Sequence, residues 1–345
     1  MAVENRGFTT TDGIDLNEIY YNTVLPILDI YNAEEVLDIR TAVCIDGDES
    51  YYKFPVNTSR WKFQKLGEVE KPTSHKITYG KRQRDTEKYG LGITYTFDWL
   101  MSEQSSSQEV AKLAAKAVAS DRDLVTAVIL ENCLDSDTSN GFYAGANYYD
   151  TNEKQDRPSP YGVNSFATSH THYVASNSAS LRVSDLSAAK EHLKEHGWGA
   201  PFVGFCNADM IKDIEDLLGL FITTTANYAF VGNDTSQSVI RDGFKGRLLG
   251  IDWIETQWMP DQYLLIIGSK AGEDKPVRFI QKKNPSAKGL LLTPGSYNAA
   301  YPLIEASYLR WFTTQVLYRA AGYVLYVAAT STYADPSIAT DNMIE

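Results

Sequence analysis

Residues 106–134, which read SSQEVAKLAAKAVASDRDLVTAVILENCL, decide how the rest of the chain is organised. Apolar side chains recur here at the three- and four-residue spacing that places them on one face of a helix. They are Val110, Leu113, Ala114, Ala117, Val118, Leu124, Val125, Val128 and Ile129. The charged residues mostly fall outside this stripe, and they are Lys112, Lys116, Asp121, Arg122 and Glu131. Ser106 with Glu109 three positions later is typical of a capping box at a helix start. The pattern predicts one uninterrupted helix.

A helix of this length rises about 40 Å at about 1.5 Å per residue. It is far longer than the average globular helix of about 11 residues. Such a helix either belongs to a coiled coil or acts as a strut for other elements. The apolar stripe does not continue through three or four heptads with leucine at the inner positions, so the strut is favoured.

The composition indicates a folded chain without a membrane span. It has 345 residues, enough for two or three domains, and 43% of them are hydrophobic. No run approaches 18 apolar residues, and the N-terminal MAVENRGFTTTDG does not have the pattern of a secretory signal. We therefore expect synthesis and use in a cytosol. Cys44, Cys133 and Cys206 are odd in number and far apart, which favours buried apolar roles over disulfides or metal ligation.

Charge is unevenly distributed along a chain whose net charge is −12. Residues 1–50 hold eleven acidic and two basic residues, a net charge of −9. Residues 53–88 hold ten basic and four acidic residues, a net charge of +6. Adjacent segments of opposite sign suggest complementary surfaces, although two solvated faces would give the same pattern. A protein that grips nucleic acid usually shows a basic face, and this chain shows none overall.

The first hundred residues offer little core of their own. Residues 15–29 predict one helix with Pro26 near its end, and the rest of residues 1–50 resembles an extended arm whose order comes from neighbours. Apolar and polar residues alternate in 60–66, 74–80 and 92–100, which predicts strands of a long hairpin. The polar, basic stretch 80–90 lies between two of these strands.

The second half predicts a compact α/β unit that begins near Val183. We expect helices over 185–196 and 207–219, a buried strand over 201–207, two strands within 246–269 broken at Met259–Pro260, and another strand over 276–281. The preceding 135–181 is polar and weakly periodic, which indicates disorder or an interface. Strands over 304–318 and 323–328 are expected to return to the long helix, and the last fifteen residues resemble a tail.

Histidine pairs are the only hint of a metal site. His170 and His172 are two residues apart, but their neighbours are Ser, Thr and Tyr rather than further ligands. His192 and His196 are four apart on an expected helix, yet Leu193 stands where a metalloprotease motif needs glutamate, which favours a solvated helix face. We therefore predict no metal, no cofactor and no catalytic residues.

Other sequence patterns for chemistry are also missing. Gly90 and Gly92 are not followed by a helix at the dinucleotide spacing. The sequence has no phosphate loop, no nucleophile elbow and no CxxC pair. Its 22 tyrosines and six tryptophans are spread along strands rather than clustered with basic residues, which favours core and subunit contacts. The sequence predicts a protein that is not an enzyme.

The order of parts, and the stretch GFKGRLLGIDWIETQWMPDQYLLIIGS at 243–269, resembles the major capsid proteins of tailed bacteriophages, a fold shared with encapsulin shells. The resemblance implies an α+β fold with an N-terminal arm, an extended E-loop, a spine helix in a peripheral P-domain, and an axial A-domain. The implied boundaries are 1–50 for the arm, 51–98 for the E-loop, 99–182 for the spine helix and following loop, 183–300 for the A-domain, 301–330 for the P-domain return strands and 331–345 for the tail. The chain reaches its hairpin by about residue 50, so a fused scaffolding segment is not expected.

The resemblance implies a structural protein that assembles into hexamers and pentamers of an icosahedral head around double-stranded DNA. It implies assembly in the host cytoplasm, residence in the virion, and partners such as a portal and a separate scaffolding or decoration protein, with no membrane. An acidic wall would enclose DNA without tight binding. The E-loop is expected to lie on an acidic surface of the next subunit, partly the 1–50 arm. Its candidate interface residues are Lys62, Lys65, Lys81, Arg82, Arg84 and Lys88.

Three alternatives remain open from the sequence. An encapsulin-type nanocompartment shell would use the same fold around cargo enzymes. A metal-dependent hydrolase would use His170 and His172. A tail or decoration protein with jelly-roll strands is disfavoured by the uninterrupted long helix.

Overall fold

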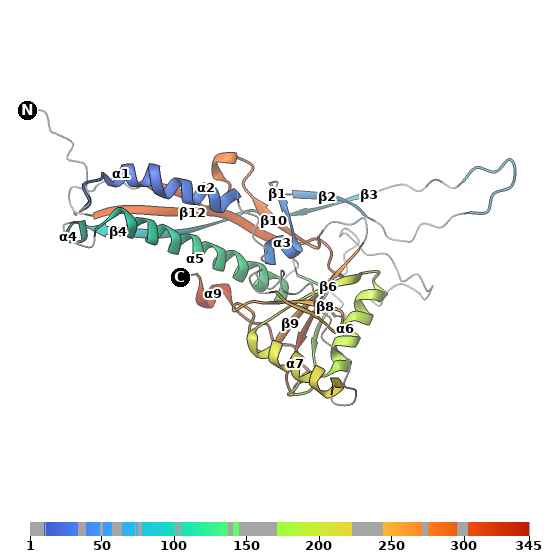
Figure 1. Cartoon of the computed structure of the whole chain (residues 1–345). Coiled ribbons are helices and arrows are strands. Elements are labelled where there is room, and N and C mark those ends of the chain that lie inside the picture. The colour runs from blue at the N-terminus through green and yellow to red at the C-terminus, as the bar shows by residue number, and fades with distance from the viewer. Residues whose placement is uncertain are drawn as a thin grey trace, which may run out of the picture.

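The long helix forms as the sequence predicts and lies between two β-sheets (Figure 1). The structure, a computed structural model, describes residues 10, 12–33, 39–48, 51–56, 64–72, 74, 78–100, 102, 105–136, 141–144, 171–222, 244–270, 275–294 and 303–344. Helix α5 spans Ser107–Leu134, and the Ser106 side chain accepts a hydrogen bond from the Glu109 amide at 3.3 Å. The cap satisfies one of the amides that a helix start leaves without an intrahelical partner.

The first sheet, here called the long sheet, is built around strand β12 (Leu303–Val316). This strand is 14 residues long, so it extends about 46 Å at about 3.3 Å per residue and matches the length of α5. It pairs antiparallel with β4, β10 and β11, and β1 extends the sheet beyond β10. The bounds are β1 Cys44–Gly47, β4 Glu87–Thr96, β10 Val277–Gln281 and β11 Leu291–Pro294.

The second sheet has six strands in the order β5-β13-β9-β6-β8-β7 and carries helices α6 and α7. Its strands are β5 Tyr173–Ala175, β6 Gly199–Cys206, β7 Phe244–Leu248, β8 Ile251–Glu255, β9 Tyr263–Ser269 and β13 Gly322–Tyr326. Helix α6 spans Val183–Glu195 and α7 spans Ala208–Ile222. Asn207 accepts a hydrogen bond from the Met210 amide at 3.0 Å, as expected of a helix cap, but α7 continues past Gly219.

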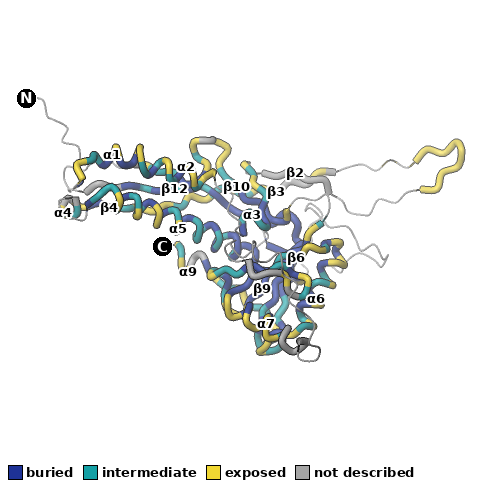
Figure 2. Tube along the Cα trace, viewed as in Figure 1, coloured by how far each residue is buried: buried dark blue, intermediate teal, exposed yellow. Residues whose placement is uncertain are grey.

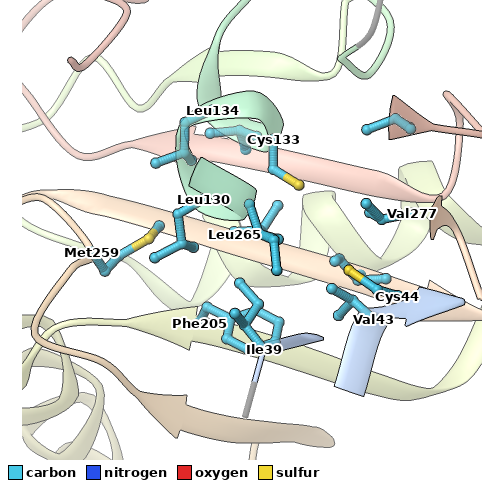
Figure 3. Packing of buried hydrophobic residues seen from close by; sticks show 14 of the residues in the cluster. Ile39, Val43, Cys44, Leu130, Cys133, Leu134, Phe205, Met259, Leu265 and Val277 are labelled. Atoms are coloured by element: carbon cyan, nitrogen blue, oxygen red, sulfur yellow. The ribbon is translucent and has the colours of Figure 1, made fainter. Parts of the chain in front are cut away.

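The two faces of the six-stranded sheet belong to different cores. Strand β9 is buried along six of its seven residues, so both of its faces are covered. Leu264 and Ile266 pack with α6 and α7, whereas Leu265 and Ile267 pack with the C-terminal half of α5. Figure 3 shows the second group, in which Leu130 and Cys133 lie beside Leu265 and Val277. The end of α5 therefore joins the long sheet to the six-stranded sheet.

The N-terminal helix predicted over 15–29 forms, and residues 39–47, expected to belong to an extended arm, also join the fold. Helices α1 (Leu16–Ile19) and α2 (Leu25–Ala33) continue through a π-helical turn, Tyr20–Val24, and run along the same end of the molecule as α5 and β12 (Figure 1). Their buried side chains contact the first half of α5, including Val110 and Ala114. The apolar spacing within 15–29 predicts this helix but not the surface on which it packs, because that surface lies far away along the chain. A further short helix, α3, spans Ile39–Val43.

The predicted hairpin is only partly confirmed. Strands β2 (Tyr51–Val56) and β3 (Thr78–Gln83) pair antiparallel as a separate two-stranded sheet. Strand β4, however, pairs with β12 over ten residues and belongs to the long sheet. The basic stretch 80–90 is therefore mostly strand, and the short helix α4 occupies Phe97–Leu100 where strand was expected. The predicted strand at 60–66 falls largely outside the described residues, and residues 64–66 are not strand.

Three later segments change places relative to the predicted domains. Strands β10 and β11, expected in the α/β unit, pair within the long sheet, and β13, expected beside the long helix, enters the six-stranded sheet. The stretch 246–269 holds parts of three strands, because Leu249 and Gly250 turn the chain with positive φ angles of 54° and 78°.

The end of the chain is anchored by Tyr333, which donates a hydrogen bond to the Leu134 carbonyl at 2.6 Å. Short helices lie at Pro285–Ala287 and at Ala339–Asn342.

A buried ion pair connects the middle of α5 to β12. Asp121 and Arg310 form it with side chains that are each 4% exposed, and Tyr31 of α2 donates a hydrogen bond to the same carboxylate at 2.8 Å. The expectation that Asp121 lies outside the buried stripe is therefore wrong. Hydrophobic periodicity treats every charged residue as solvated, and it cannot detect a partner 189 positions away.

We expect Asp121→Ala to lower the free energy of unfolding by about 3–5 kcal/mol, because the Arg310 guanidinium then stays buried without its counter-ion. The double replacement Asp121→Leu with Arg310→Met removes both charges and should recover most of this loss. Urea unfolding of the unassembled chain, followed by circular dichroism, measures both. Lys112→Ala on the same helix is the control, since its ion pair with Glu109 is exposed and worth at most about 1 kcal/mol. A comparable small loss for Asp121→Ala would contradict a structural role for the pair.

Candidate functional site: an assembly surface and a histidine cluster

The basic residues predicted for the interface divide into two groups. Lys65 is exposed in the loop 64–72, and Lys81 and Arg82 occupy positions on β3. Lys62 lies outside the described residues. The strand register places Lys81 opposite Lys53 of β2. Like charges directly opposite each other destabilise a strand pair, so an acidic surface brought against this hairpin would stabilise it.

Arg84 and Lys88, by contrast, are engaged within the chain. Arg84 donates hydrogen bonds from Nη1 to the Asn132 side chain at 2.8 Å and to the Thr314 carbonyl at 2.7 Å. It thereby fixes the base of the hairpin to the end of α5 and to β12. The Lys88 ammonium lies 5.6 Å from the centre of the Trp311 ring. Both residues have an intrachain role that charge counting along the sequence could not separate from a docking role.

Large apolar side chains are exposed on the same projecting region. The described loop residues 64–72 lie far from both sheets in Figure 2 and are exposed throughout. Val69 is 95% exposed, and Tyr79 on β3 is 69% exposed. Single exposed apolar residues are normal, but several on one projecting element are typical of a surface that is covered by a partner.

The outward face of helices α1 and α2 offers a complementary surface. Tyr21 and Ile30 are 65% and 69% exposed, and the acidic residues Glu18 and Asp29 are exposed beside them in the sequence. We call these four residues the outer helical face.

Other acidic residues among the first fifty make ion pairs or hydrogen bonds within the same chain. Asp46 pairs with Arg40 at 2.8 Å, and Asp12 accepts hydrogen bonds from Ser107. These hydrogen bonds lower the pKa of Asp12 to about 2.

Three histidines come together beside the six-stranded sheet. His172 precedes β5, while His192 and His196 lie at the C-terminal end of α6. His172 and His196 are 0% and 2% exposed, and the two Nε2 atoms are 3.3 Å apart. The interpretation of His192 and His196 as a solvated helix face is therefore wrong for His196. His170, the expected partner of His172, lies outside the described residues.

All three cysteines are buried and free, as the sequence predicts. Burial raises the pKa of the Cys133 thiol to about 12, and burial also raises the pKa of Cys206. A protonated, buried thiol is a poor nucleophile. Among the helices that the structure describes, none is long and apolar enough to cross a bilayer.

Comparison with solved structures places this fold in the class of viral and virus-like capsid shells. A chain from Mycobacterium phage Patience matches with a TM-score of 0.61 and 20% identity, over 97% of this chain and 94% of the other. A capsid chain of a native GTA particle matches with a TM-score of 0.51 and 12% identity, over 86% of this chain and 92% of the other. An encapsulin chain from Synechococcus elongatus PCC 7942 has a TM-score of 0.48 and 13% identity.

No protein-family model matches the sequence, and no curated protein matches it either. The similarity is therefore one of fold, at low sequence identity. The resemblance to the capsid proteins of tailed phages, drawn from the order of elements in the sequence, is confirmed at that level.

Cys44, Cys133 and Cys206 should not react with a chromogenic disulfide reagent in the native chain, because all three side chains are buried and the reagent cannot reach them. We expect release of about three thiol equivalents only after unfolding in guanidinium chloride, matching the three cysteines of the sequence. Fast reaction of any of them in native buffer would show that the cores around α5 and β6 open readily.

Proposed function

We propose that this chain is a structural major capsid protein, which assembles into hexamers and pentamers to form an icosahedral head around double-stranded phage DNA. The observation that carries the proposal is a fold shared over 97% of this chain with a chain of Mycobacterium phage Patience, and over 86% of it with a capsid chain of a native GTA particle. The absence of a recognisable nucleophile or phosphate loop in the sequence supports a structural rather than an enzymatic role.

In this proposal the two sheets take the family's domain roles. The six-stranded sheet with α6 and α7 is the axial A-domain, and α5 with the long sheet is the peripheral P-domain. The β2–β3 hairpin is the E-loop, and its boundary moves from residue 98 to about residue 83, since β4 belongs to the long sheet. Helices α1 and α2 extend the P-domain.

Contact between subunits follows from the surfaces that one chain leaves uncovered. The hairpin brings basic residues, including Lys65 and Lys81, together with the exposed Val69 and Tyr79. The outer helical face brings acidic residues beside exposed Tyr21 and Ile30. Both surfaces combine apolar and charged groups of opposite sign, which is the pattern of a specific interface. We assign the outer helical face of one subunit as the surface that receives the hairpin of its neighbour.

Assembly of the shell would involve further proteins and would take place in the host cell. A portal and a separate scaffolding or decoration protein are the expected partners, with assembly in the host cytoplasm and residence in the virion. An encapsulin-type compartment is the alternative role for the same fold. Nucleic acid inside purified particles would support the phage head, whereas a packaged enzyme would support the encapsulin role.

Reversing Lys65, Lys81 and Arg82 to glutamate should abolish or strongly reduce shell formation, because the hairpin then repels the acidic face of the neighbouring subunit. Negative-stain microscopy and sedimentation of the expressed chain measure closed particles of uniform diameter. The defect should be largest at low salt, where charges act over about 10 Å or more.

The matched control keeps the charge at the same positions, with Lys65→Arg, Lys81→Arg and Arg82→Lys, and should assemble normally. Arg84→Glu should instead lower the stability of the isolated subunit, since it breaks the hydrogen bonds to Asn132 and Thr314. Normal particle yield from the glutamate triple variant would refute the assigned contact. A wild-type chain that stays monomeric at high concentration would refute the shell role itself.

The unassembled chain should bind duplex DNA no more tightly than a dissociation constant of about 10 μM at about 150 mM salt, because few phosphates would be neutralised by an acidic protein. Fluorescence anisotropy with a labelled duplex over a salt series measures this. Tight binding with a steep salt dependence would show that the inner wall clamps its contents.

A further inference from the structure

The strongest unassigned feature is the cluster of His172, His192 and His196. Among the residues that the structure describes, these three form the one group of at least three potential metal-binding side chains close enough to share an ion. One ring nitrogen from each lies within 4.8 Å of the others. We propose that the cluster is a binding site for a divalent transition-metal cation, with Zn²⁺ as the preferred ion. The proposal does not depend on the shell role.

The spacing of the nitrogens fits this ion. Two nitrogens bound to one tetrahedral zinc at about 2.0–2.1 Å lie about 3.4 Å apart. The Nε2 atoms of His172 and His196 are 3.3 Å apart, so two of the three ligands already have the required separation. His192 is only partly buried, and rotation of its side chain can bring its nitrogen closer.

A backbone carbonyl orients the central ligand. The Nδ1 atom of His172 lies 2.6 Å from the Gly322 carbonyl oxygen, so it carries the proton and donates it to that oxygen. The lone pair is then on Nε2, the atom that faces His196. A metal-bound histidine usually donates its second ring N–H to a carbonyl or carboxylate in this way. The arrangement sets the tautomer that metal binding needs.

The backbone around His172 is held on both sides. Its amide donates to the Tyr143 carbonyl at 2.7 Å, and its own carbonyl accepts from the Val324 amide at 2.8 Å. Gly322 is required here, because a side chain would place its Cβ 2.2 Å from the Phe142 ring. Buried Arg319 fixes this segment by donating to the Gly141 and Phe142 carbonyls at 3.0 and 3.1 Å. The site is therefore built on rigid elements, as an effective metal site is.

The ligand set selects the class of cation. Imidazole nitrogens suit zinc, copper, nickel and iron, whereas calcium and magnesium prefer oxygen ligands. Three histidines leave one tetrahedral position for water or another ligand. A bound ion would join the end of α6 to the residue that precedes β5, at the edge of the six-stranded sheet. We expect it to stabilise this unit rather than to create activity.

A direct competitor is a purely hydrogen-bonded cluster, in which His196 donates from Nε2 to His172. The ring centres of His172 and His192 are 4.5 Å apart in an edge-on arrangement, which would also serve simple packing. The two roles differ in one property. A metal site binds about one ion per chain with defined geometry, and a packing cluster binds none.

The test uses the full chain, stripped with a chelator and dialysed against metal-free buffer. Titration with zinc sulfate, followed by calorimetry and elemental analysis, should give about one zinc per chain, and zinc should raise the melting temperature. Cobalt(II) in its place should show the strong visible absorption of a four-coordinate ion. Magnesium and calcium should have no such effect.

The diagnostic variant is His192→Gln, chosen because His192 is partly exposed and its replacement leaves the buried pair in place. We expect zinc affinity to fall by more than the roughly 10- to 100-fold that loss of a supporting hydrogen bond costs. Lys194→Gln, at an exposed position of the same helix, is the matched control and should bind zinc as the wild type does. His192→Gln without zinc should keep the circular dichroism spectrum of the stripped wild type. Failure of the wild type to bind stoichiometric zinc, or equal affinity in the His192 variant, would overturn the proposal.

Discussion

The C-terminal half of α5 is buried on opposite sides by two different sheets, and the rest of the structure depends on this. Leu130 and Cys133 share one apolar cluster with Leu265 of the six-stranded sheet and Phe279 of the long sheet. Apolar burial stabilises by roughly 25 cal/mol per Å², so a helix end covered on all sides is a strong anchor. Neither sheet covers its inner face without this helix. The angle between the two sheets, and with it the shape of the subunit, is set by the packing around residues 125–134 of α5.

The first half of α5 is held in place in a different way. It packs on one side only, against α1, α2 and β12, and its position along β12 is fixed by the Asp121–Arg310 ion pair. Apolar burial is non-directional, so it specifies the position of a helix along a strand less sharply than a buried ion pair does. A buried ion pair forms at only one position of the helix along the strand, and separating the two charges inside the protein costs free energy. Tyr31 joins the same carboxylate, so α2 is fixed to the same point.

Local patterns in the sequence predict the helices well and the sheets poorly. The boundaries of α5 and α6 follow from apolar periodicity and from caps such as Ser106, because a helix satisfies its hydrogen bonds within one segment. Strand pairing is nonlocal, so nothing near 277–281 shows that β10 pairs with β12 rather than with β9. The same holds for β13, whose continuous apolar run fits any buried strand.

The candidate sites also differ in how much of each could be predicted from local sequence. Charge counting placed the basic surface on the hairpin, which depends on composition alone. It did not separate Arg84, whose guanidinium is bound to Asn132, from Lys81, because that distinction depends on residues 48 and 230 positions away along the chain from Arg84. The histidine cluster was out of reach for sequence reasoning, since His172 and His196 meet only after β5 and α6 are placed on one sheet. The four-residue spacing of His192 and His196 predicts that they lie on one face of a helix. Which residue lies opposite that face depends on how the helix packs on the sheet.

The division of charges between internal and external contacts explains how one chain can be both stable and ready to assemble. Arg310 pairs with Asp121 and Arg84 with Asn132, so both guanidinium groups have partners within the fold. Lys53 and Lys81 are opposite each other in the register of a two-stranded hairpin, and such a hairpin is only marginally stable by itself. Stability is therefore concentrated around α5, and in the proposed shell the hairpin would gain the most from contact with a neighbour.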